Sequence, residues 1–265
     1  MKKGETLCCV RKRLGSHLRL EPFPFGLGAR DRGFGFRGSA IQLRSWSPNL
    51  RICKKTGVAQ VGSIVVGIAG GSASGKSTVV RELTSLMGRS RVAVLSHDAY
   101  YHDLSHMPIG RRSQVNVDHP DSLQTSLLLR HIKALQAGHT VEVPSYDYAS
   151  QTRSSAGITI TSAPVLIVEG MLVLCDERLR DLMDLRVFVD TSPEQRLQRR
   201  IERDVLERGR DAKTVKQQHL ERVQPMHEIY VQPSRVHADF LIPGGGHNIE
   251  SIRALAGQVL ELLDG

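Results

Sequence analysis

From about residue 61 to the end of the chain, short apolar runs alternate with longer stretches of helical periodicity. Short continuous apolar runs are typical of strands that are buried on both faces of a parallel sheet. They predict strands at Ile64–Ala69, Val92–Ser96, Val165–Val168, Arg186–Val189 and Asp239–Ile242.

The segments between these runs predict helices, at Lys76–Met87, Pro120–Ala137, Pro193–Glu207 and residues 212–229 and 249–263. In the second of these, Pro120 suits a first turn, Gly138 suits a stop, and apolar residues repeat at helical spacing. Those apolar residues are Leu123, Leu127, Ile132 and Leu135.

The alternation of strand and helix predicts an α/β fold with a doubly wound parallel sheet of about five strands. Two further short runs, Thr140–Val143 and Ile158–Thr161, predict a hairpin outside the main sheet. Ligands bind such sheets beyond the carboxyl ends of the strands, so residues that follow strands are the first candidates for chemistry.

The stretch "GIAGGSASGKST" follows the first strand and fits G-x-x-x-x-G-K-[ST], the P-loop pattern, with Gly70, Gly75, Lys76 and Ser77 at the fixed positions. Such a loop exposes backbone N–H groups, and the helix after it adds the positive end of its dipole. We expect a polyphosphate to bind here, with the lysine at its outer phosphates and the serine hydroxyl on Mg²⁺. The alternative is a Gly/Ser-rich linker, which the strand–loop–helix context disfavours.

The net charge of +9 is unevenly distributed along the 265 residues. Residues 1–60 hold thirteen Lys/Arg against three Asp/Glu, and the remainder holds 23 against 24. The near-neutral body argues against a nucleic-acid partner. The basic segment lacks any helical or strand period, so we expect it to be disordered. It is an organelle transit peptide, a flexible basic tail or the product of a start codon placed too far upstream.

Cys8, Cys9 and Cys53 lie in that segment, which leaves Cys175 alone in the body. One cysteine predicts no disulfide framework, and a reducing, cytoplasmic setting is expected. No apolar stretch is long enough to span a membrane, and no secretory signal lies near Met1.

Two carboxylates follow predicted strands. Asp98, in "VLSHDAYY", can accept the proton of an attacking hydroxyl, although a helix-capping role fits its position equally well. Glu169, in "PVLIVEG", ends a buried run, where P-loop enzymes keep an acidic residue that helps to hold Mg²⁺. A carboxylate exposed to solvent at the strand end is the alternative for Glu169.

The stretch "RRIERDVLERGRD" concentrates arginine. Arginines on a mobile segment can close over a transferring phosphoryl group. A solvated charged helix face explains the pattern as well, because Glu202, Asp204 and Glu207 interleave with the arginines. The arginines are Arg199, Arg200, Arg203, Arg208 and Arg210.

Two further stretches carry groups that suit a nucleoside. Aspartates accept hydrogen bonds from paired sugar hydroxyls, and tyrosines stack on flat rings. "VNVDHPDS" holds Asp118 and Asp121, and "VPSYDYASQTRS" holds Tyr146, Asp147, Tyr148, Gln151 and Arg153. The irregular spacing of His97, His102, His106 and His119 disfavours a metal site.

Taken together, "GGSASGKS", "SHDAYY", "NVDHPDS", "PSYDY…R", "IVEG" and "RRIERDVLERGRD" resemble the uridine kinase (uridine–cytidine kinase) family, bacterial type, in its motif order. The resemblance runs from about Val61 to the C-terminus. It implies a P-loop nucleoside kinase domain over residues 61–265, with a small hairpin over the nucleoside site and an Arg-rich lid. The implied reaction moves the γ-phosphate of ATP or GTP to the 5′-hydroxyl of uridine and cytidine.

The resemblance also implies roles for individual residues. Asp98 is the implied general base, acting with Lys76, Arg203 and Arg208, and Mg²⁺ would be held by Ser77 and Glu169. The implied phosphate-binding residues are Gly70, Gly71, Ser72, Ala73, Ser74, Gly75, Lys76, Ser77 and Thr78. The implied nucleoside-binding residues are Tyr101, Asp118, Tyr146, Tyr148, Gln151, Arg200, Arg210 and Gln218. The family also implies a homotetramer and feedback inhibition by CTP.

Two positions depart from the family pattern. Val117 replaces an aromatic residue that many members carry before the ribose-binding aspartate, which loosens packing beside the sugar. Gln151 stands where many members have histidine, which leaves the choice of base open.

Three other functions are weighed against a nucleoside kinase. A P-loop kinase of another small molecule, such as phosphoribulokinase, shares the architecture, but the tyrosine-rich hairpin favours a flat base. A regulatory nucleotide-binding switch or GTPase predicts N-K-x-D, which does not occur in the chain. A nucleic-acid-binding module predicts a steep salt dependence that resides in residues 1–60.

Overall fold

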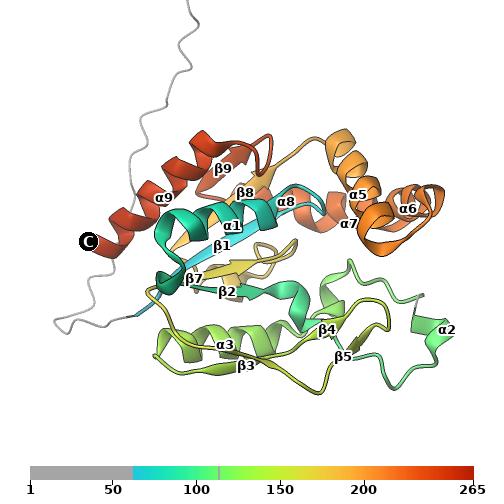
Figure 1. Ribbon diagram of the computed structural model, residues 1–265, viewed down its shortest axis with the longest axis horizontal. Helices are drawn as coiled ribbons and strands as arrows, with labels where there is room; N and C mark the ends of the chain where they lie inside the picture. Colours follow the sequence, from blue (N-terminus) through green and yellow to red (C-terminus); the bar gives the residue numbers. More distant parts are fainter. Residues whose placement is uncertain (1–61, 113) are drawn as a thin grey trace, which may run out of the picture. The chain divides into compact units, whose positions relative to one another are not determined.

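The computed structural model of the protein describes residues 62–112 and 114–265, so the interpretation of residues 1–60 lies outside the described residues. Within those ranges, five parallel strands form one sheet in the order β2-β7-β1-β8-β9 (Figure 1). They are β1 (Ile64–Gly70), β2 (Val92–Ser96), β7 (Val165–Glu169), β8 (Leu185–Asp190) and β9 (Phe240–Pro243). The five predicted strands are confirmed to within one residue at each end.

The sheet reverses its winding at β1, because the chain runs to β2 and β7 on one side and to β8 and β9 on the other. A reversal of this kind opens a crevice at the carboxyl ends of the strands, where ligands bind doubly wound sheets. The loop after β1 enters this crevice directly.

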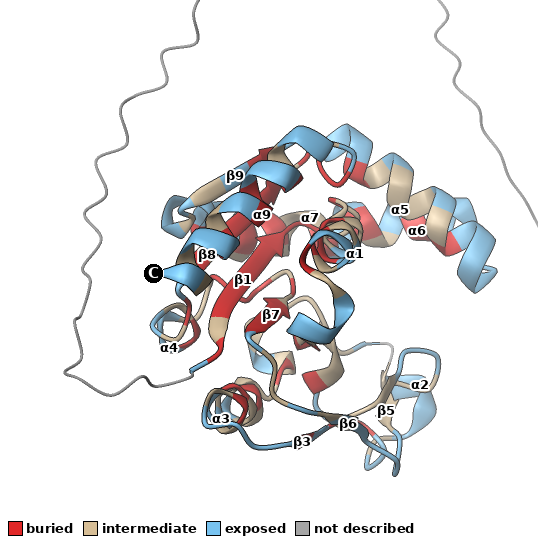
Figure 2. Ribbon diagram, turned by 60° about the vertical axis from the view of Figure 1, so that its left-hand side comes forward, coloured by how far each residue is buried: buried red, intermediate tan, exposed pale blue. Residues whose placement is uncertain are grey.

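Alternate residues of β1 pack into two separate cores. Val66 and Ile68 belong to the core beneath α1 (Lys76–Met87) and α9 (Ile249–Asp264). Val65 and Ala69 belong to the core beneath α3 (Thr125–Gln136). Figure 1 shows α1 and α9 on one side of the sheet and α3 on the other, and Figure 2 shows β1 buried along most of its length. Both faces of the sheet are covered, as the continuous apolar runs predict.

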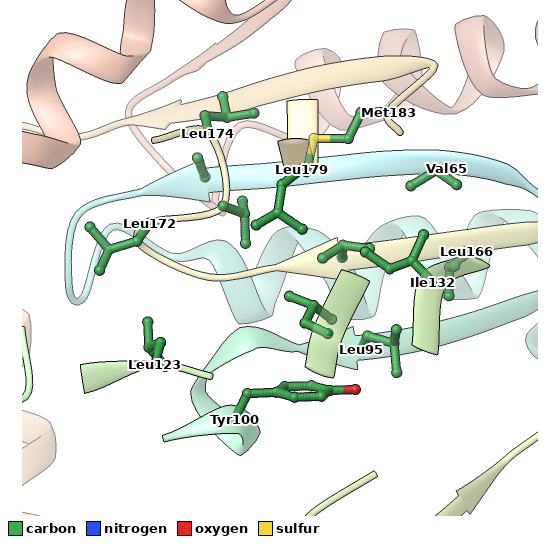
Figure 3. Close-up of a cluster of buried hydrophobic side chains, with 14 of the residues drawn as sticks. Val65, Leu95, Tyr100, Leu123, Ile132, Leu166, Leu172, Leu174, Leu179 and Met183 are labelled. Carbon is green, nitrogen blue, oxygen red and sulfur yellow. The ribbon is translucent and has the colours of Figure 1, made fainter. Parts of the chain in front are cut away.

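The core beneath α3 joins three strands to one helix. Val65, Leu95 and Leu166 come from β1, β2 and β7, and Ile132 of α3 lies beside them (Figure 3). All four side chains are fully buried. This packing fixes the end of β2, from which the next functional residues follow.

The helix predicted at Pro120–Ala137 is wrong at its N-terminal end. The chain forms a short 3₁₀ turn, η3 (Pro120–Ser122), and α3 begins only at Thr125. Leu123 is extended between them and pairs in an isolated antiparallel bridge with Tyr101. The long-range bridge and the burial of Leu123 outweigh continuation of the local helix.

The predicted hairpin outside the main sheet is confirmed, as β3 (Val141–Val143) pairs antiparallel with β6 (Ile158–Ile160). The chain between them folds into a second, shorter hairpin, β4 (Tyr146–Asp147) with β5 (Thr152–Arg153). The shorter hairpin, hereafter the β4–β5 hairpin, carries Tyr146 and Tyr148, two of the three tyrosines that were assigned to the nucleoside site.

The predicted helices near the C-terminus have different lengths in the structure. α5 (Pro193–Arg208) is confirmed, with Ser192 as N-cap and Gly209 in the left-handed conformation as C-cap. The helix predicted at 212–229 continues to residue 237 through alternating α, π and 3₁₀ segments. These are α6 (Ala212–Gln218), η4 (His219–Val223), α7 (Gln224–Met226), η5 (His227–Val231), α8 (Gln232–Ser234) and η6 (Arg235–His237).

Two prolines inside this helical run explain its π segments. A proline ring clashes with the carbonyl group four residues earlier in an α-helix and removes one donor. The carbonyl groups concerned belong to Glu221, before Pro225, and Ile229, before Pro233, and both lie in π segments. The wider π turn makes room for each ring, so the helix continues where the sequence pattern predicts an end.

The remaining short elements lie between those already named. They are η1 (Arg89–Arg91), η2 (His97–Tyr100), α2 (Ile109–Arg112) and α4 (Glu177–Arg180). In the part of the chain that the structure describes, every helix is too short or too polar to cross a bilayer.

Candidate active site

A cavity of about 1050 Å³ opens at the carboxyl ends of β1, β2 and β7, between the P-loop, α5 and the β4–β5 hairpin. Eighteen of the residues assigned to the site from sequence line it, whereas Gly70, Gly71 and Ser74 do not. The lining residues are Ser72, Ala73, Gly75, Lys76, Ser77, Thr78, Asp98, Tyr101, Asp118, Tyr146, Tyr148, Gln151, Glu169, Arg200, Arg203, Arg208, Arg210 and Gln218.

The P-loop curls around its own lysine. The Lys76 ammonium donates to the carbonyl oxygens of Gly70 and Gly71, at 3.0 Å each. Burial lowers the pKa of Lys76, while the nearby carboxylates of Glu169 and Asp98 act in the opposite direction. The ammonium therefore lies at the phosphate end of the cavity, close to both carboxylates.

Gly71 allows a buried arginine to approach the loop from behind. A Cβ atom at Gly71 would lie 2.6 Å from Nη1 of Arg196. Arg196 is 3% exposed and donates through Nε to the carbonyl oxygen of Thr191, at 3.2 Å. Arg196 does not line the cavity, so the loop separates it from the site.

The two residues assigned to Mg²⁺ offer oxygen atoms to the same cavity. Glu169 ends β7, and its Oε1 accepts a hydrogen bond of 2.6 Å from the Ser96 hydroxyl at the end of β2. Ser77 lies in the first turn of α1. The structure thus favours an oriented carboxylate at Glu169 over a freely solvated one.

Asp98 lies in η2, directly after β2, and its side chain is half-buried in the cavity. Burial raises its pKa to about 6, and the neighbouring carboxylates of Glu169 and Asp118 add to the rise. Lys76 and Arg203 act in the opposite direction. Asp98 lies inside η2, and no side-chain hydrogen bond caps the start of this turn. The structure therefore does not support a helix-capping role for Asp98.

Three tyrosines form one wall of the cavity. The rings of Tyr101 and Tyr146 lie 5.2 Å apart between centroids, and the rings of Tyr146 and Tyr148 lie 5.5 Å apart. The guanidinium carbon of Arg208 lies 5.7 Å from the centroid of the Tyr148 ring. The buried hydroxyl of Tyr146 has no hydrogen-bond partner among the described residues. This tyrosine wall lines the cavity with aromatic rings.

Asp118 and Gln151 complete the end of the cavity that contains the tyrosine wall. Burial raises the pKa of Asp118, and the charges of Arg200 and Arg222 oppose the rise. Gln151 has a φ of 56°, which is uncommon for a residue with a side chain, and its carbonyl oxygen accepts a hydrogen bond from Leu104. The tight turn at the tip of the β4–β5 hairpin therefore directs this residue into the cavity wall.

The charged pattern on α5 is not a uniformly solvated face. The sequence pattern groups Asp204 with the charges of a solvated helix face. In the structure its side chain is completely buried. Its carboxylate accepts hydrogen bonds from Arg203, at 2.8 and 2.9 Å, and from Arg210, at 3.1 Å. Asp204 was not among the site residues predicted from sequence, although its spacing of four residues from both Arg200 and Arg208 indicates pairing with them.

Some of the other candidates have roles outside the cavity. Arg153 donates to the carbonyl oxygens of Tyr101 and Tyr100, at 2.8 and 3.1 Å, and to the side chain of Gln124, at 2.8 Å. The Asp121 side chain is 92% exposed. Arg153 is therefore a structural link between the β4–β5 hairpin and η2, and Asp121 contacts solvent.

The histidines are separated from one another. Buried His97 contacts the hydroxyl of Thr125, at 3.3 Å, and His119 contacts the hydroxyl of Tyr230, at 2.8 Å. His102 and His106 are exposed. Within residues 62–112 and 114–265, no group of three or more His, Cys, Asp or Glu residues is placed to hold a metal ion.

Arg112 also lines the cavity and was not a candidate from sequence. Its guanidinium donates to the carbonyl oxygens of Met107, Ser150 and Ser105, at 2.9, 2.8 and 3.2 Å. It thereby ties the loop after η2 to the hairpin tip beside Gln151. No sequence motif marks a residue whose partners are backbone atoms distant along the chain.

The geometry agrees with comparisons to known proteins. Residues 65–250 match the model of the Phosphoribulokinase / Uridine kinase family. The chain belongs to this family. The matched residues include every element around the cavity, and the phosphate loop lies close to the start of the match.

Several curated members of the family are similar over almost their whole length. A uridine kinase of Chloroflexus aurantiacus is 43% identical over 196 residues, which cover 74% of this chain and 94% of that protein. A uridine kinase of Geobacillus kaustophilus is 44% identical over 201 residues, which cover 76% of this chain and 95% of that protein. A uridine kinase of Lactococcus lactis subsp. cremoris is 42% identical over 202 residues, which cover 76% of this chain and 98% of that protein.

Solved structures of lower identity share the P-loop kinase fold. A putative fructose transport system kinase from Silicibacter superposes with a TM-score of 0.57 at 20% identity, covering 71% of this chain and 93% of that chain. Phosphoribulokinase from Rhodobacter spheroides superposes with a TM-score of 0.52 at 14% identity. The match covers 69% of this chain and 70% of that chain. These two likenesses concern the fold alone.

Proposed function

We propose that the protein is a uridine/cytidine kinase, which transfers the γ-phosphate of ATP or GTP to the 5′-hydroxyl of the nucleoside. The observation that carries the proposal is that one cavity has the P-loop at one end and the tyrosine wall with Asp118 at the other. The names of the similar curated proteins support the same substrate class.

In the proposed reaction, Asp98 is the general base. Its pKa of about 6 leaves it mostly ionised at neutral pH, yet makes it a better proton acceptor than an ordinary carboxylate. It accepts the proton of the 5′-hydroxyl as that oxygen attacks the γ-phosphorus. Lys76 and the arginines of α5 stabilise the charge that spreads over the transferring phosphoryl group.

The nucleoside is proposed to lie between Asp118 and the tyrosine wall. Asp118 accepts hydrogen bonds from the ribose hydroxyls, Tyr146 and Tyr148 contact the base, and Gln151 lies at the edge of the base. The Gln151 amide, which carries both donors and an acceptor, supplies the polar groups that a pyrimidine edge requires.

The residues at the phosphate end fit a bound Mg²⁺. Ser77 and Glu169 offer only oxygen atoms, and Mg²⁺ takes a few protein oxygens while substrate phosphates and water fill its other positions. When bound, the ion neutralises charge on the phosphates. The Ser96 hydroxyl holds the Glu169 carboxylate in a fixed orientation through its 2.6 Å hydrogen bond.

Several finer features remain predictions. They are inhibition by CTP, assembly as a homotetramer, a cytoplasmic location and the absence of nucleic-acid or membrane partners. The preference between ATP and GTP as donor is left open.

The test is phosphate transfer from ATP by the full chain to uridine, cytidine, adenosine, guanosine and ribulose 5-phosphate. We expect uridine and cytidine to be phosphorylated and the purine nucleosides to fail, because the tyrosine wall excludes a second ring. Turnover of ribulose 5-phosphate alone would favour the phosphoribulokinase alternative. ATP hydrolysis that none of the acceptors stimulates would overturn the proposal and favour a nucleotide switch.

A further inference from the structure

Asp204 has an unusual environment for a carboxylate. It lies in the fourth turn of α5 with no exposed surface, and it is the one buried Asp or Glu among the described residues. A buried charge is costly unless it is paired and hydrogen-bonded. The contacts of Asp204 therefore require an explanation.

Four guanidinium groups surround this single carboxylate. Arg203 and Arg210 lie 2.8 and 3.1 Å from it, Arg208 lies at 3.5 Å and Arg200 at 4.0 Å. All four arginines also line the cavity. They are hereafter called the arginine array.

The array contacts two other parts of the cavity lining. Arg200 donates through Nη1 to the hydroxyl of Ser72 in the P-loop, at 3.0 Å. Arg210 donates to the side chain of Gln218 at the end of α6. Through the arginines around Asp204, the P-loop is linked to α6.

The backbone of Asp204 supports the same arrangement. Its carbonyl oxygen accepts hydrogen bonds from the N–H groups of Gly209 and Arg210. Gly209 has a φ of 60°, in the left-handed region, and turns the chain between α5 and α6. Both the side chain and the main chain of Asp204 thus hold the segment that carries Arg208 and Arg210.

Electrostatics explains why one carboxylate is needed here. Burial alone would raise the pKa of Asp204, but the hydrogen bond from Arg203 and the surrounding guanidinium charges lower it overall. The group is therefore ionised. Four like charges so close together repel one another, and a central anion offsets that repulsion.

We propose that Asp204 is the positioning residue of the arginine array, which it holds in the geometry that receives the γ-phosphate. The proposal rests on the proposed kinase function, because the array then meets the transferring group. Asp204 itself lies behind the arginines and touches neither substrate.

The test compares Asp204→Asn with Glu202→Gln in the full chain. Both changes remove one negative charge from α5, but Glu202 is exposed and its carboxylate accepts a hydrogen bond from Gln198. We expect kcat for uridine to fall about 10–100-fold in the Asp204 variant, since a small misplacement of catalytic groups has effects of this size. The Glu202 variant should stay within about twofold of the wild type.

The affinities for nucleotides distinguish a positioning role of Asp204 from a general loss of folded protein in the variant. We expect Asp204→Asn to weaken binding of a non-hydrolysable ATP analogue about tenfold. The affinity for ADP, which lacks the γ-phosphate, should fall by less than about twofold. This measurement does not depend on the acceptor. It remains decisive even where the wild type phosphorylates no nucleoside and the proposed function fails.

Asp204→Glu covers the case in which the asparagine variant does not fold. It keeps the charge but moves the carboxylate by one methylene, so we expect a folded protein with kcat reduced at least about fivefold. Wild-type kcat and wild-type selectivity for the ATP analogue over ADP in this variant would overturn the proposal. So would equal losses of ATP-analogue and ADP affinity in a folded Asp204→Asn protein.

Discussion

At the scale of single residues, the environment proposed to suit Asp98 for chemistry also affects stability. Burial in the cavity raises the pKa of its carboxyl group to about 6, and the carboxylates of Glu169 and Asp118 add to the rise. An acid whose pKa is higher in the folded than in the unfolded state destabilises the fold once it ionises. The same environment that suits Asp98 to its proposed role as general base therefore weakens the folded protein.

Asp98→Asn should separate the two effects. We expect kcat to fall by about 10²–10⁴-fold, because the amide cannot accept the proton. The melting temperature at pH 7.5 should rise by a few degrees, on the order of 2–4 °C per kcal/mol for a domain of this size. Steady-state kinetics and thermal melts measure the two changes.

The sign of the stability change follows from titration. The pKa of Asp98 rises from 3.8 to about 6 on folding, so the destabilisation grows between these pH values and is complete above pH 6. The gain in the asparagine variant should shrink as the pH falls through 6 toward 4. If kcat is unchanged in the variant, Asp98 is not the general base. If the gain in melting temperature does not depend on pH, the ionisation of Asp98 is not its cause.

Gln151 is the second residue for which one substitution is decisive. A glutamine amide satisfies either uracil or cytosine by turning over, whereas a glutamate only accepts. In Gln151→Glu, the ratio of kcat/KM for cytidine over uridine should rise by about one to two powers of ten, because O4 of uracil meets a carboxylate. Competition kinetics with both nucleosides measures the ratio.

Gln114→Glu is the matched control, since Gln114 is exposed and does not line the cavity. Its ratio should equal that of the wild type. An unchanged ratio in the Gln151 variant would mean that this residue does not contact the base.

At the scale of elements, the site depends on how the β4–β5 hairpin is attached to the rest of the fold. The hairpin has only four paired residues, and so short a ribbon is not stable by itself. Arg153 supplies one attachment, because its forked guanidinium reaches Tyr100, Tyr101 and Gln124 at once. Arg112 adds a second at the hairpin tip, through the carbonyl oxygen of Ser150. We expect the positions of Tyr146 and Tyr148 to depend on these links.

Arg153→Lys keeps the charge but replaces the fork by a single ammonium group. We expect the KM for uridine to rise about tenfold, because Tyr146 and Tyr148 lose their fixed position, while the KM for ATP changes less than about twofold. Initial-rate kinetics with each substrate varied in turn gives both constants.

Arg111→Lys makes the same chemical change at an exposed position and should leave both constants unaltered. An equal rise of both KM values in the Arg153 variant would indicate general damage to the fold. Unchanged values would show that the hairpin does not need this link.

At the scale of the whole molecule, the described chain contains every residue assigned to the reaction. The family match covers residues 65–250, and the cavity is lined by residues between Ser72 and Val223. The excess of positive charge lies in residues 1–60 instead. The proposed reaction assigns no role to that segment.

Deletion of residues 1–57 should leave kcat, both KM values and the melting temperature close to those of the full chain. The comparison needs both proteins prepared in parallel, and binding to anionic vesicles or RNA at low salt serves as a second readout. A large loss of activity or stability would mean that the segment packs on the enzyme.

The sequence by itself determined the parts of this protein that depend on local pattern. Apolar runs predict all five strands of the main sheet, and the P-loop pattern identifies the phosphate end of the cavity with the lysine that lies in it. These features follow from steric and periodic rules that act over a few residues, so they can be read without knowing which segments meet.

Only the tertiary structure decided which charged side chains are buried and with what they pair. Asp204 and Glu202 are alike in sequence, two positions apart on one helix, yet one is enclosed by four arginines and the other faces solvent. The start of α3 and the link through Arg153 depend likewise on contacts with distant segments. Burial and partner choice are properties of the packed chain, because they depend on which distant surfaces exclude water together.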